Sequence, residues 1–254
     1  MPPLTFAADT SAAIPLQGIS SDGLADWLAG IAEEHAAWLE ATGFTARAGQ
    51  AAVVPDGAGG IAFAVAGLGK LAEAGRARFK FADVRSALPK GTYRREADLH
   101  GAALEQAARG GVLAGYRLDR YATATPPAAE LIAPEGIDAA RVEAIAAGEA
   151  LTRDLINTPA ADMGPPDLEA AARALASDYA AAIEVVTGDA LIDGNFPMIH
   201  AVGRAADRAP RLIDLRWGDS GPRVTLVGKG VCFDTGGLNL KPGGSMGLMK
   251  KDMG

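Results

Sequence analysis

Apolar and polar positions in the first part of the chain follow both the helical and the strand period. Apolar side chains recur at helical spacing over residues 19–42, behind a group of N-cap residues that includes Asp22, and this predicts a helix. Short apolar runs at 51–55 and 61–68 flank the turn-forming sequence Asp-Gly-Ala-Gly-Gly, which predicts two strands joined by a turn. A second helical pattern covers residues 99–118.

Strand patterns alternate with helical patterns in the second part of the chain. An alanine-rich helix is expected at 137–156, because its apolar residues form a stripe and Pro159 follows it. The other expected elements are a helix at 167–178, strands at 131–132, 183–186, 212–217 and 224–227, and a last helix at 246–253 with Ser245 as its N-cap. This alternation predicts an α/β fold with a central, largely parallel sheet flanked by helices.

The two parts of the chain are expected to form separate domains. A length of 254 residues suits one large domain or two modest ones. Small residues and prolines dominate the segment 122–136, which interrupts regular structure. We therefore expect a smaller N-terminal α/β domain at residues 1–130 and a second α/β domain at residues 131–254.

Composition and charge narrow the classes of function. Hydrophobic residues make up 49% of the chain, so a buried core is expected and overall disorder is not. The net charge is -7 and no basic run is present, so nucleic-acid binding is not expected. Cys232 is the single cysteine, which is typical of a reducing cytoplasm. The N-terminus lacks a basic leader pattern, and no apolar stretch reaches ~18 residues, so neither a signal peptide nor a membrane span is expected.

Candidate chemistry gathers after the strand expected at 224–227, where Lys229, Asp234, Lys241 and Asp252 follow in one segment. In open α/β sheets, binding sites lie at the carboxyl ends of strands. A buried lysine is costly unless its charge is paired or its proton is removed, and an amine that binds a metal must be neutral. Carboxylates are natural ligands of divalent ions, so the segment predicts a metal site. Taken singly, each residue could equally be a solvated lysine or a turn or helix aspartate.

The same segment resembles a known family. Residues 227–254, VGKGVCFDTGGLNLKPGGSMGLMKKDMG, are similar residue by residue to the metal-binding stretch of the leucyl (cytosol) aminopeptidase family, the M17-type two-metal aminopeptidases. The segments RDLINTPAADMGPPDL at 153–168 and GYRLDRY at 115–121 also resemble that family. The similarity is dense from about residue 99 onward and sparse before it. The resemblance implies that residues 1–130 form a non-catalytic assembly domain and that residues 131–254 begin the catalytic domain.

The resemblance also implies roles for single residues. Lys229 would bind one metal through a neutral amine, and Asp252 would bind the same metal. Asp234 would bridge two divalent ions, which would be manganese or zinc, with magnesium as a further choice. Lys241 would be the catalytic cation that polarises the substrate carbonyl. Met249 would line the pocket for the first side chain of the substrate, and Lys229, Asp234 and Lys241 would also contact the substrate.

The implied activity is release of N-terminal amino acids from peptides, with apolar residues such as leucine preferred, in a cytoplasmic homo-hexamer. In the family, the remaining metal ligands come from an Asn-Thr-Asp-Ala-Glu-Gly-Arg segment further downstream. No such segment occurs in these 254 residues. We therefore expect this sequence to cover only the first portion of the catalytic domain and to be inactive alone.

Other readings of the sequence remain open. The chain could be a non-catalytic fragment or a binding or assembly protein of the same fold. A phosphate- or nucleotide-binding protein is a third class, but Gly228-Lys229-Gly230 lacks the spacing of a phosphate-binding loop. Residues expected to have only structural or surface roles are Cys232, Met246, Met253, His35, His100 and His200.

Overall fold

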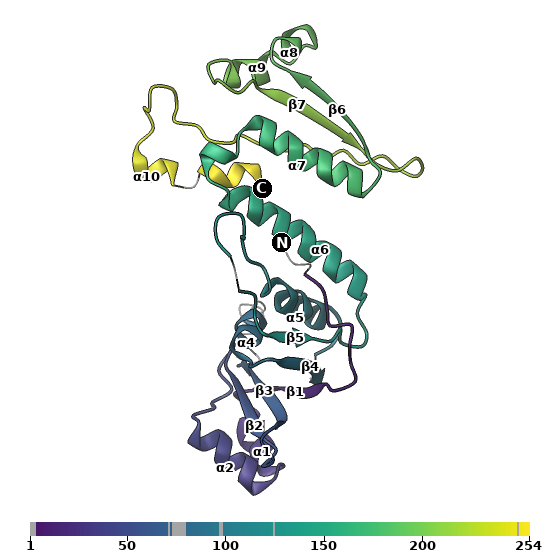
Figure 1. Ribbon diagram of the computed structural model, residues 1–254, viewed down its shortest axis with the longest axis vertical. Helices are drawn as coiled ribbons and strands as arrows, with labels where there is room; N and C mark the ends of the chain where they lie inside the picture. Colours follow the sequence, from purple (N-terminus) through teal and green to yellow (C-terminus); the bar gives the residue numbers. More distant parts are fainter. Residues whose placement is uncertain (1–3, 71, 73–79, 97–98, 124, 248) are drawn as a thin grey trace. The chain divides into compact units, whose positions relative to one another are not determined.

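The computed structural model of this protein describes residues 4–70, 72, 80–96, 99–123, 125–247 and 249–254. The chain divides into two compact units, Met1–Ala150 and Leu151–Gly254 (Figure 1). Each unit is considered by itself below. The domain boundary expected between residues 130 and 131 stays a prediction.

Unit 1 is built on a five-stranded sheet. Its strands are β1 (Ile14–Ser20), β2 (Ala51–Pro55), β3 (Ile61–Gly69), β4 (Gly91–Glu96) and β5 (Ala129–Leu131). The order is β2-β3-β1-β4-β5, and only the β2–β3 pair is antiparallel. The predicted α/β class with a mostly parallel sheet flanked by helices is confirmed. The predicted strand–turn–strand is confirmed as well, since β2 and β3 are the two strands that flank the glycine-rich turn.

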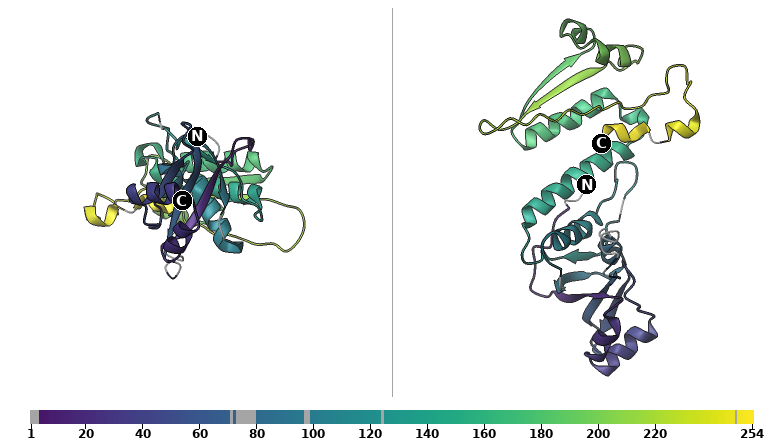
Figure 2. Two further views of the ribbon diagram at one scale, coloured as in Figure 1. Left: turned by 90° about the horizontal axis from the view of Figure 1, so that it is seen from below. Right: turned by 180° about the vertical axis from the view of Figure 1, so that it is seen from behind.

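Helices cover both faces of this sheet, because successive side chains of a strand point to opposite faces. Ala64 and Ala66 of β3 belong to a core cluster with residues of α4 (Phe81–Ala87) and α5 (Gly101–Leu113). Val65, between them, belongs to a second cluster that includes Leu39 of α2 (Glu33–Ala41), with α1 (Leu24–Ala29) packed beside it. The two views in Figure 2 show these helices beside the strands.

The single helix expected over residues 19–42 is wrong. Strand β1 ends at Ser20, and two short helices, α1 and α2, follow it. Helix α1 stops at Gly30, whose N–H bonds to the carbonyl of Trp27, and Ala32 is extended with φ -59° and ψ 138°. The helical spacing of apolar residues continues across this break because both helices pack on the same face of the sheet. The helix expected at 99–118 is shorter than predicted and is α5.

Helix α6 (Ala139–Asn157) confirms the long alanine-rich helix. Its residues Ala146 and Ala150 pack with Val112 and Leu113 of unit 1. The helix ends where Thr158, almost fully buried, donates its hydroxyl hydrogen to the carbonyl of Asp154 at 2.7 Å. Pro159 follows and lacks the N–H that would extend the helix.

Unit 2 holds the remaining elements, which are η2 (Ala160–Asp162), α7 (Pro165–Asp178), β6 (Ala182–Thr187), α8 (Ala190–Asp193), α9 (Pro197–Gly203), β7 (Arg211–Arg216), α10 (Gly243–Met246) and η3 (Met249–Met253). The predicted helix at 167–178 and the strands at 183–186 and 212–217 correspond to α7, β6 and β7. Strands β6 and β7 pair antiparallel, with Ala182 opposite Arg216 and Thr187 opposite Arg211. Helix α7 lies along this pair in Figure 1.

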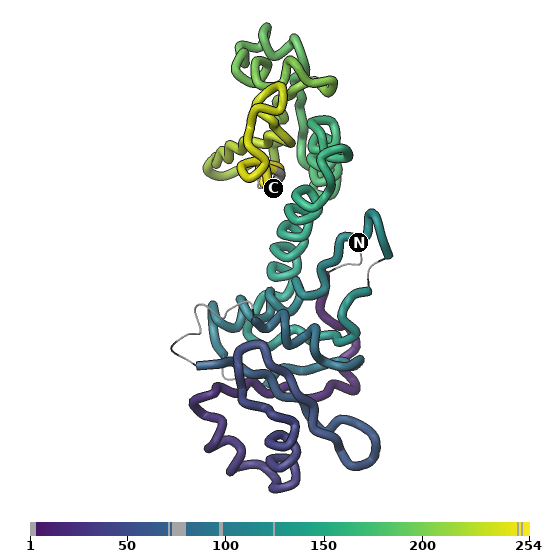
Figure 3. The backbone as a smooth tube through the Cα atoms, turned by 90° about the vertical axis from the view of Figure 1, so that its left-hand side faces the viewer, coloured from purple at the N-terminus to yellow at the C-terminus, as the bar shows by residue number. Residues whose placement is uncertain are grey.

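Two elements expected in this unit are wrong. Residues 224–227 form no strand, and no described strand pairs with them. Their apolar side chains are exposed, with Val227 at 92%. The single helix expected at 246–253 is replaced by the short α10 and the 3-10 turn η3, and Pro242 rather than Ser245 is the N-cap of α10. Figure 3 shows the loop that leads to α10 and η3 in yellow-green and yellow.

None of the helices in the described residues combines the length and the apolar character that crossing a membrane needs.

Candidate metal centre

A tight turn of backbone presents Asp234. The N–H of Gly236 donates to the Asp234 Oδ1 at 2.7 Å, which closes an Asx-type turn. Gly236 has φ +80°, and a Cβ on it would lie 2.9 Å from the Lys241 Cγ. Both facts require glycine here, because L side chains rarely adopt this conformation and the space is filled. The Asp-Thr-Gly-Gly sequence therefore folds the loop back toward Lys241.

Lys241 contacts both Asp234 and Met249. The Lys241 backbone N–H bonds to the carbonyl of Thr235 at 2.9 Å, which fixes the return of the loop. The Lys241 Nζ then donates to the Asp234 Oδ2 at 2.5 Å. The same Nζ lies 3.4 Å from the Met249 Sδ. Three of the residues predicted for the site are thus in direct contact.

Lys229 and Asp252 form the second pair. The Lys229 Nζ lies 3.2 Å from the Asp252 Oδ2, although the two residues are far apart in sequence. The Lys229 side chain is mostly exposed and Asp252 is partly buried. The positive charge of Lys229 also acts on Asp234 and is among the causes that lower its pKa. The structure therefore brings all five predicted residues into two neighbouring groups.

A small apolar cluster explains how the two ends of this segment meet. Cys232 and Met253 are both buried and pack with Met163, and Leu155 and Leu168 lie against them. Cys232 lies between Lys229 and Asp234 in sequence, and Met253 follows Asp252 directly. Burial of these apolar side chains therefore anchors both halves of the motif. This agrees with the structural role expected for Cys232 and Met253.

Electrostatics at the site favour a negative Asp234 carboxylate and a neutral Cys232 thiol. The hydrogen bond from Lys241 and then the one from the Gly236 N–H lower the pKa of Asp234 below its ordinary value of 3.8. Burial first, and then the negative charge of Asp167, raise the pKa of the Cys232 thiol above its ordinary value of 9.0. Asp234 is thus ready to bind a cation at neutral pH, whereas Cys232 is not prepared as a nucleophile.

The donor set fits a divalent cation in its chemistry. Two carboxylates and one amine are groups that bind such ions, and each carboxylate already faces a positive ammonium group. Hard divalent ions take about six donors, so these three side chains supply only part of a coordination shell. Among the described residues, no group of three or more His, Cys, Asp or Glu side chains could hold a metal by itself.

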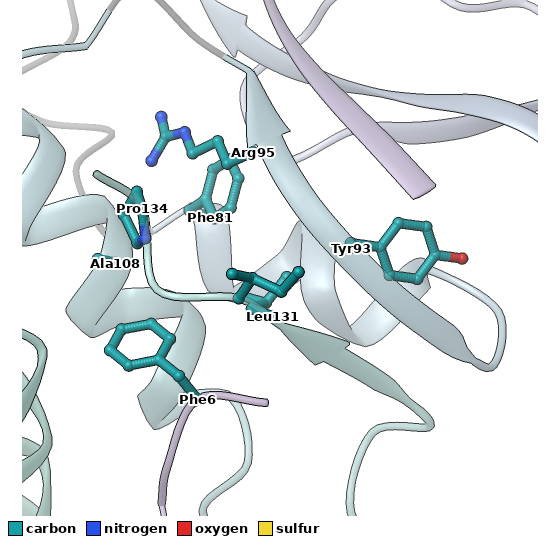
Figure 4. A pocket seen from close by; sticks show the side chains of 8 residues that line it. Phe6, Phe81, Tyr93, Arg95, Ala108, Leu131 and Pro134 are labelled. Atoms are coloured by element: carbon teal, nitrogen blue, oxygen red, sulfur yellow. The ribbon is translucent and has the colours of Figure 1, made fainter. Parts of the chain in front are cut away.

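One buried cation in unit 1, Arg95, was not predicted as a candidate. It lies on β4 (Figure 4), a strand that no pattern in the sequence analysis predicted. The alternation Tyr93–Arg94–Arg95 was the available signal, because it places Arg95 on the same face as the fully buried Tyr93.

Comparison with known proteins defines the class of this chain. The family model described as "Cytosol aminopeptidase family, catalytic domain" matches residues 150–254. The model described as "M17 aminopeptidase, N-terminal domain" matches residues 14–134. Both models describe the M17 aminopeptidases, and together they span both units of the chain.

Curated and solved relatives agree with these models. A probable cytosol aminopeptidase of Leifsonia xyli subsp. xyli is 36% identical over 98% of this chain and 54% of its own length. The crystal structure of the cytosol aminopeptidase from Coxiella burnetii has 37% identity and a TM-score of 0.85 over 98% of this chain and 54% of that one. The bottromycin maturation enzyme BotP, solved in complex with Mn, has 30% identity and a TM-score of 0.73 over 96% of this chain and 53% of its own.

This chain belongs to the cytosol aminopeptidase family, as the resemblance in the sequence predicted. It spans about half the length of the curated relatives and solved structures described above.

Proposed function

We propose that these residues form part of a metal-dependent aminopeptidase that releases N-terminal amino acids from peptides, with apolar residues such as leucine preferred. Residues 131–254 are the first portion of its catalytic domain, and residues 1–130 are a non-catalytic domain that supports assembly. The protein acts in the cytoplasm as a homo-hexamer. The 254-residue chain alone is inactive.

The observation that supports this proposal best is the convergence of two Lys–Asp pairs in unit 2. Lys229 meets Asp252 at 3.2 Å, and Lys241 meets Asp234 at 2.5 Å. Ordinary surface ion pairs contribute ~0–1 kcal/mol, so stability alone gives little reason to gather them on a loop. Because the chain belongs to an aminopeptidase family, we infer that these pairs serve metal binding and catalysis.

Each of these side chains has a role in the proposed site. Asp234 and Asp252 offer carboxylate oxygens, and Lys229 offers its amine after losing a proton. In this arrangement Asp252 and Lys229 would hold one divalent ion, and Asp234 would be shared between two. The ions are manganese or zinc, with magnesium as a further choice. Manganese has support from the relative BotP, which is described in complex with Mn. When bound, such ions would supply Lewis acidity toward a peptide carbonyl and a water molecule.

Lys241 acts directly on the substrate. Its Nζ is a positive hydrogen-bond donor that lies 2.5 Å from the Asp234 Oδ2. An ammonium group placed at a developing oxyanion stabilises the transition state more than the ground state. Met249 lies within 3.4 Å of the Lys241 Nζ and offers a flexible apolar wall for the first side chain of the substrate.

Hydrolysis of leucine p-nitroanilide tests this function. The protein should be expressed from the complete reading frame that contains these 254 residues and assayed with Mn²⁺ or Zn²⁺. Turnover should fall at least about a hundredfold in Lys241→Met, because removal of one preorganised donor to an oxyanion typically costs about that much. Lys251→Met is the matched control, since Lys251 is an exposed lysine of the same segment.

Three outcomes would contradict the proposal. Absence of turnover with either metal would favour the non-catalytic binding or assembly protein instead. Turnover that Lys241→Met leaves unchanged would remove the proposed role of Lys241. Turnover by the 254-residue chain alone would show that it needs no further residues.

A further inference from the structure

The side chain of Arg208 holds the turn between η2 and α7. The Arg208 Nη2 donates to the Ala161 carbonyl at 2.7 Å, and the Nη1 donates to the Asp167 Oδ2 at 3.1 Å. The same Oδ2 accepts the N–H of Gly164 at 2.9 Å. Arg208 therefore connects the 3-10 turn before Met163 with the first turn of α7 after it.

The contact is close because position 164 carries no side chain. A Cβ on Gly164 would lie 2.4 Å from the Arg208 Nη1 and 2.8 Å from its Cδ. Arginine suits this place, since its planar fork presents several N–H donors in fixed directions. Both side chains of the Arg208–Asp167 pair are 40% exposed, so the pair by itself contributes little to stability. Its main consequence is the conformation of the turn.

Met163 is the residue that this turn presents to the candidate metal centre. It is 5% exposed and packs with Cys232 and Met253 in one cluster. Cys232 lies two residues before Asp234, and Met253 follows Asp252 directly. In Figure 1 the turn between η2 and α7 lies beside η3. A shift of the turn would therefore move Met163 and open the apolar contact that both halves of the motif share.

We propose that Arg208 is a positioning residue of the candidate metal centre. By fixing the turn that carries Met163, it keeps the apolar cluster closed and so holds the two candidate carboxylate ligands, Asp234 and Asp252, in the same site. Arg208 acts on these ligands through Met163. This inference rests on the metal-dependent function proposed above, but closure of the cluster can be measured without metal or substrate.

Alkylation of Cys232 measures whether the cluster is closed. The protein expressed from the complete reading frame is treated with iodoacetamide and a chelator, and peptide-resolved mass spectrometry follows modification of Cys232. Arg208→Met should raise the rate about tenfold, because the turn loses two charge-assisted hydrogen bonds.

The charge of Arg208 cannot produce this acceleration by itself. Burial is the main cause that raises the pKa of the Cys232 thiol, and the positive charge of Arg208 acts in the opposite direction. Removal of that charge alone would therefore leave less thiolate and slow the alkylation. A faster reaction in Arg208→Met reports exposure of the thiol.

Titration with Mn²⁺ measures whether the closed cluster holds the ligands. Arg208→Met should weaken Mn²⁺ binding about tenfold, the low end of what loss of a group behind a metal ligand costs. Arg208→Lys should recover at least part of both wild-type values, because its ammonium can still donate to one of the two acceptors. Gly164→Ala should reproduce both effects of Arg208→Met, since the added Cβ would displace the guanidinium.

A double variant tests the route through Met163. If Arg208 acts through Met163, then Arg208→Met/Met163→Ala should match Met163→Ala within about twofold in both measurements. Arg204→Met is the matched control, because Arg204 is an exposed arginine that precedes Arg208 in the same segment. Both its values should stay within about twofold of the wild type.

Several results would overturn the inference. The first is an alkylation rate in Arg208→Met equal to that of the wild type. The second is faster alkylation with unchanged Mn²⁺ affinity, which would contradict this inference and leave the proposed function standing. Additive effects in the double variant would remove the route through Met163. Loss of folding in Arg208→Met would assign it a general structural role. A wild type that binds no Mn²⁺ would contradict the proposed function and this inference together.

Discussion

The ion pair between Glu169 of α7 and Arg211 of β7 should be the strongest polar contact that holds these two elements together. The Glu169 Oε2 accepts a hydrogen bond from the Arg211 Nη1, and the side chains are only 15% and 12% exposed. Glu169 also accepts a bond from the Arg173 Nε at 2.7 Å, but Arg173 is half exposed. Among the described residues, Glu169→Ala would therefore leave Arg211 as a nearly buried charge whose remaining hydrogen-bond partner is the Ala209 carbonyl.

The loss of the Glu169–Arg211 pair and the loss of the Glu169–Arg173 pair are expected to change the free energy of unfolding by different amounts. Removal of one partner from a buried pair costs about 3–5 kcal/mol. The exposed pair with Arg173 contributes ~0.3–0.5 kcal/mol. Because Arg211 keeps its bond to the Ala209 carbonyl, we expect the lower end, about 3 kcal/mol. Each 1.4 kcal/mol is about a tenfold change in an opening equilibrium, so this corresponds to about a hundredfold.

Native-state hydrogen exchange measures this change locally. The amides that pair β6 with β7 should exchange about a hundredfold faster in Glu169→Ala, and the amides of the β1–β3 pair in unit 1 should be unchanged. Glu169→Ala/Arg211→Met should recover most of the loss, because no buried charge remains unpaired. Arg216→Met is the control, since its pairs with Asp214 and Glu184 are exposed, and we expect less than about a fivefold change.

The same pair predicts a pH dependence. Hydrogen bonds from Arg173 first and from Arg211 second lower the pKa of Glu169 below its ordinary value of 4.5. A carboxyl with a lowered folded pKa stabilises the fold above its unfolded pKa and loses this contribution as pH falls through the folded value. The difference between wild type and Glu169→Ala should therefore be full at pH 7 and shrink below about pH 4. An exchange rate within twofold of the wild type at pH 7, or a double variant less stable than the single one, would refute the reasoning.

Two further predictions concern packing. Gly67→Ala should lower the stability of unit 1 by about 3 kcal/mol, because the added Cβ would lie 2.1 Å from the Arg47 carbonyl oxygen. Gly148→Ala, in an exposed and open position of α6, should instead raise the melting temperature. Equal melting temperatures of the two variants would contradict this. Cys232, 8% exposed, should react with iodoacetamide at least tenfold more slowly in the native chain than in urea, and prompt native alkylation would show that its cluster is open.

The sequence patterns correctly predicted those helices and strands that are determined by residues near to them in the sequence. The glycine-rich turn specified the β2–β3 pair, and α6 ended shortly before Pro159, as expected. The pattern over residues 19–42 wrongly predicted one continuous helix. Helices α1 and α2 pack on the same face of the sheet, so their apolar residues keep a single helical periodicity across the break at Ala32. Periodicity reports which face is buried and does not show that the backbone is continuous.

For the candidate site, the identity of the residues was predicted from the sequence, whereas their roles have not been tested. Residue types and spacing pointed to Lys229, Asp234, Lys241 and Asp252, and the family resemblance added Met249. These five residues do lie in two contacting groups. Their roles as ligands and catalyst stay predictions.

The local elements that present these residues were not predictable. The apolar run at 224–227 favours a strand, but a strand needs a partner, and no described strand pairs with it. The helix expected at 246–253 is replaced by the short α10 and η3, and Met253 at the end of η3 packs on Cys232, which lies far from it in sequence. Contacts between residues that are distant in the sequence cannot be predicted from a local pattern of apolar residues.

Calorimetric titration with Mn²⁺ tests the central claim most directly. In the protein expressed from the complete reading frame, we predict two ions per subunit for the wild type. Asp252→Asn and Asp234→Asn should each lose at least one ion or weaken binding at least about a hundredfold, since even loss of a group behind a ligand costs 10–100-fold. Asp219→Asn, an exposed aspartate of the same unit, should bind like the wild type. Two ions bound with unchanged affinity in both ligand variants would contradict the account.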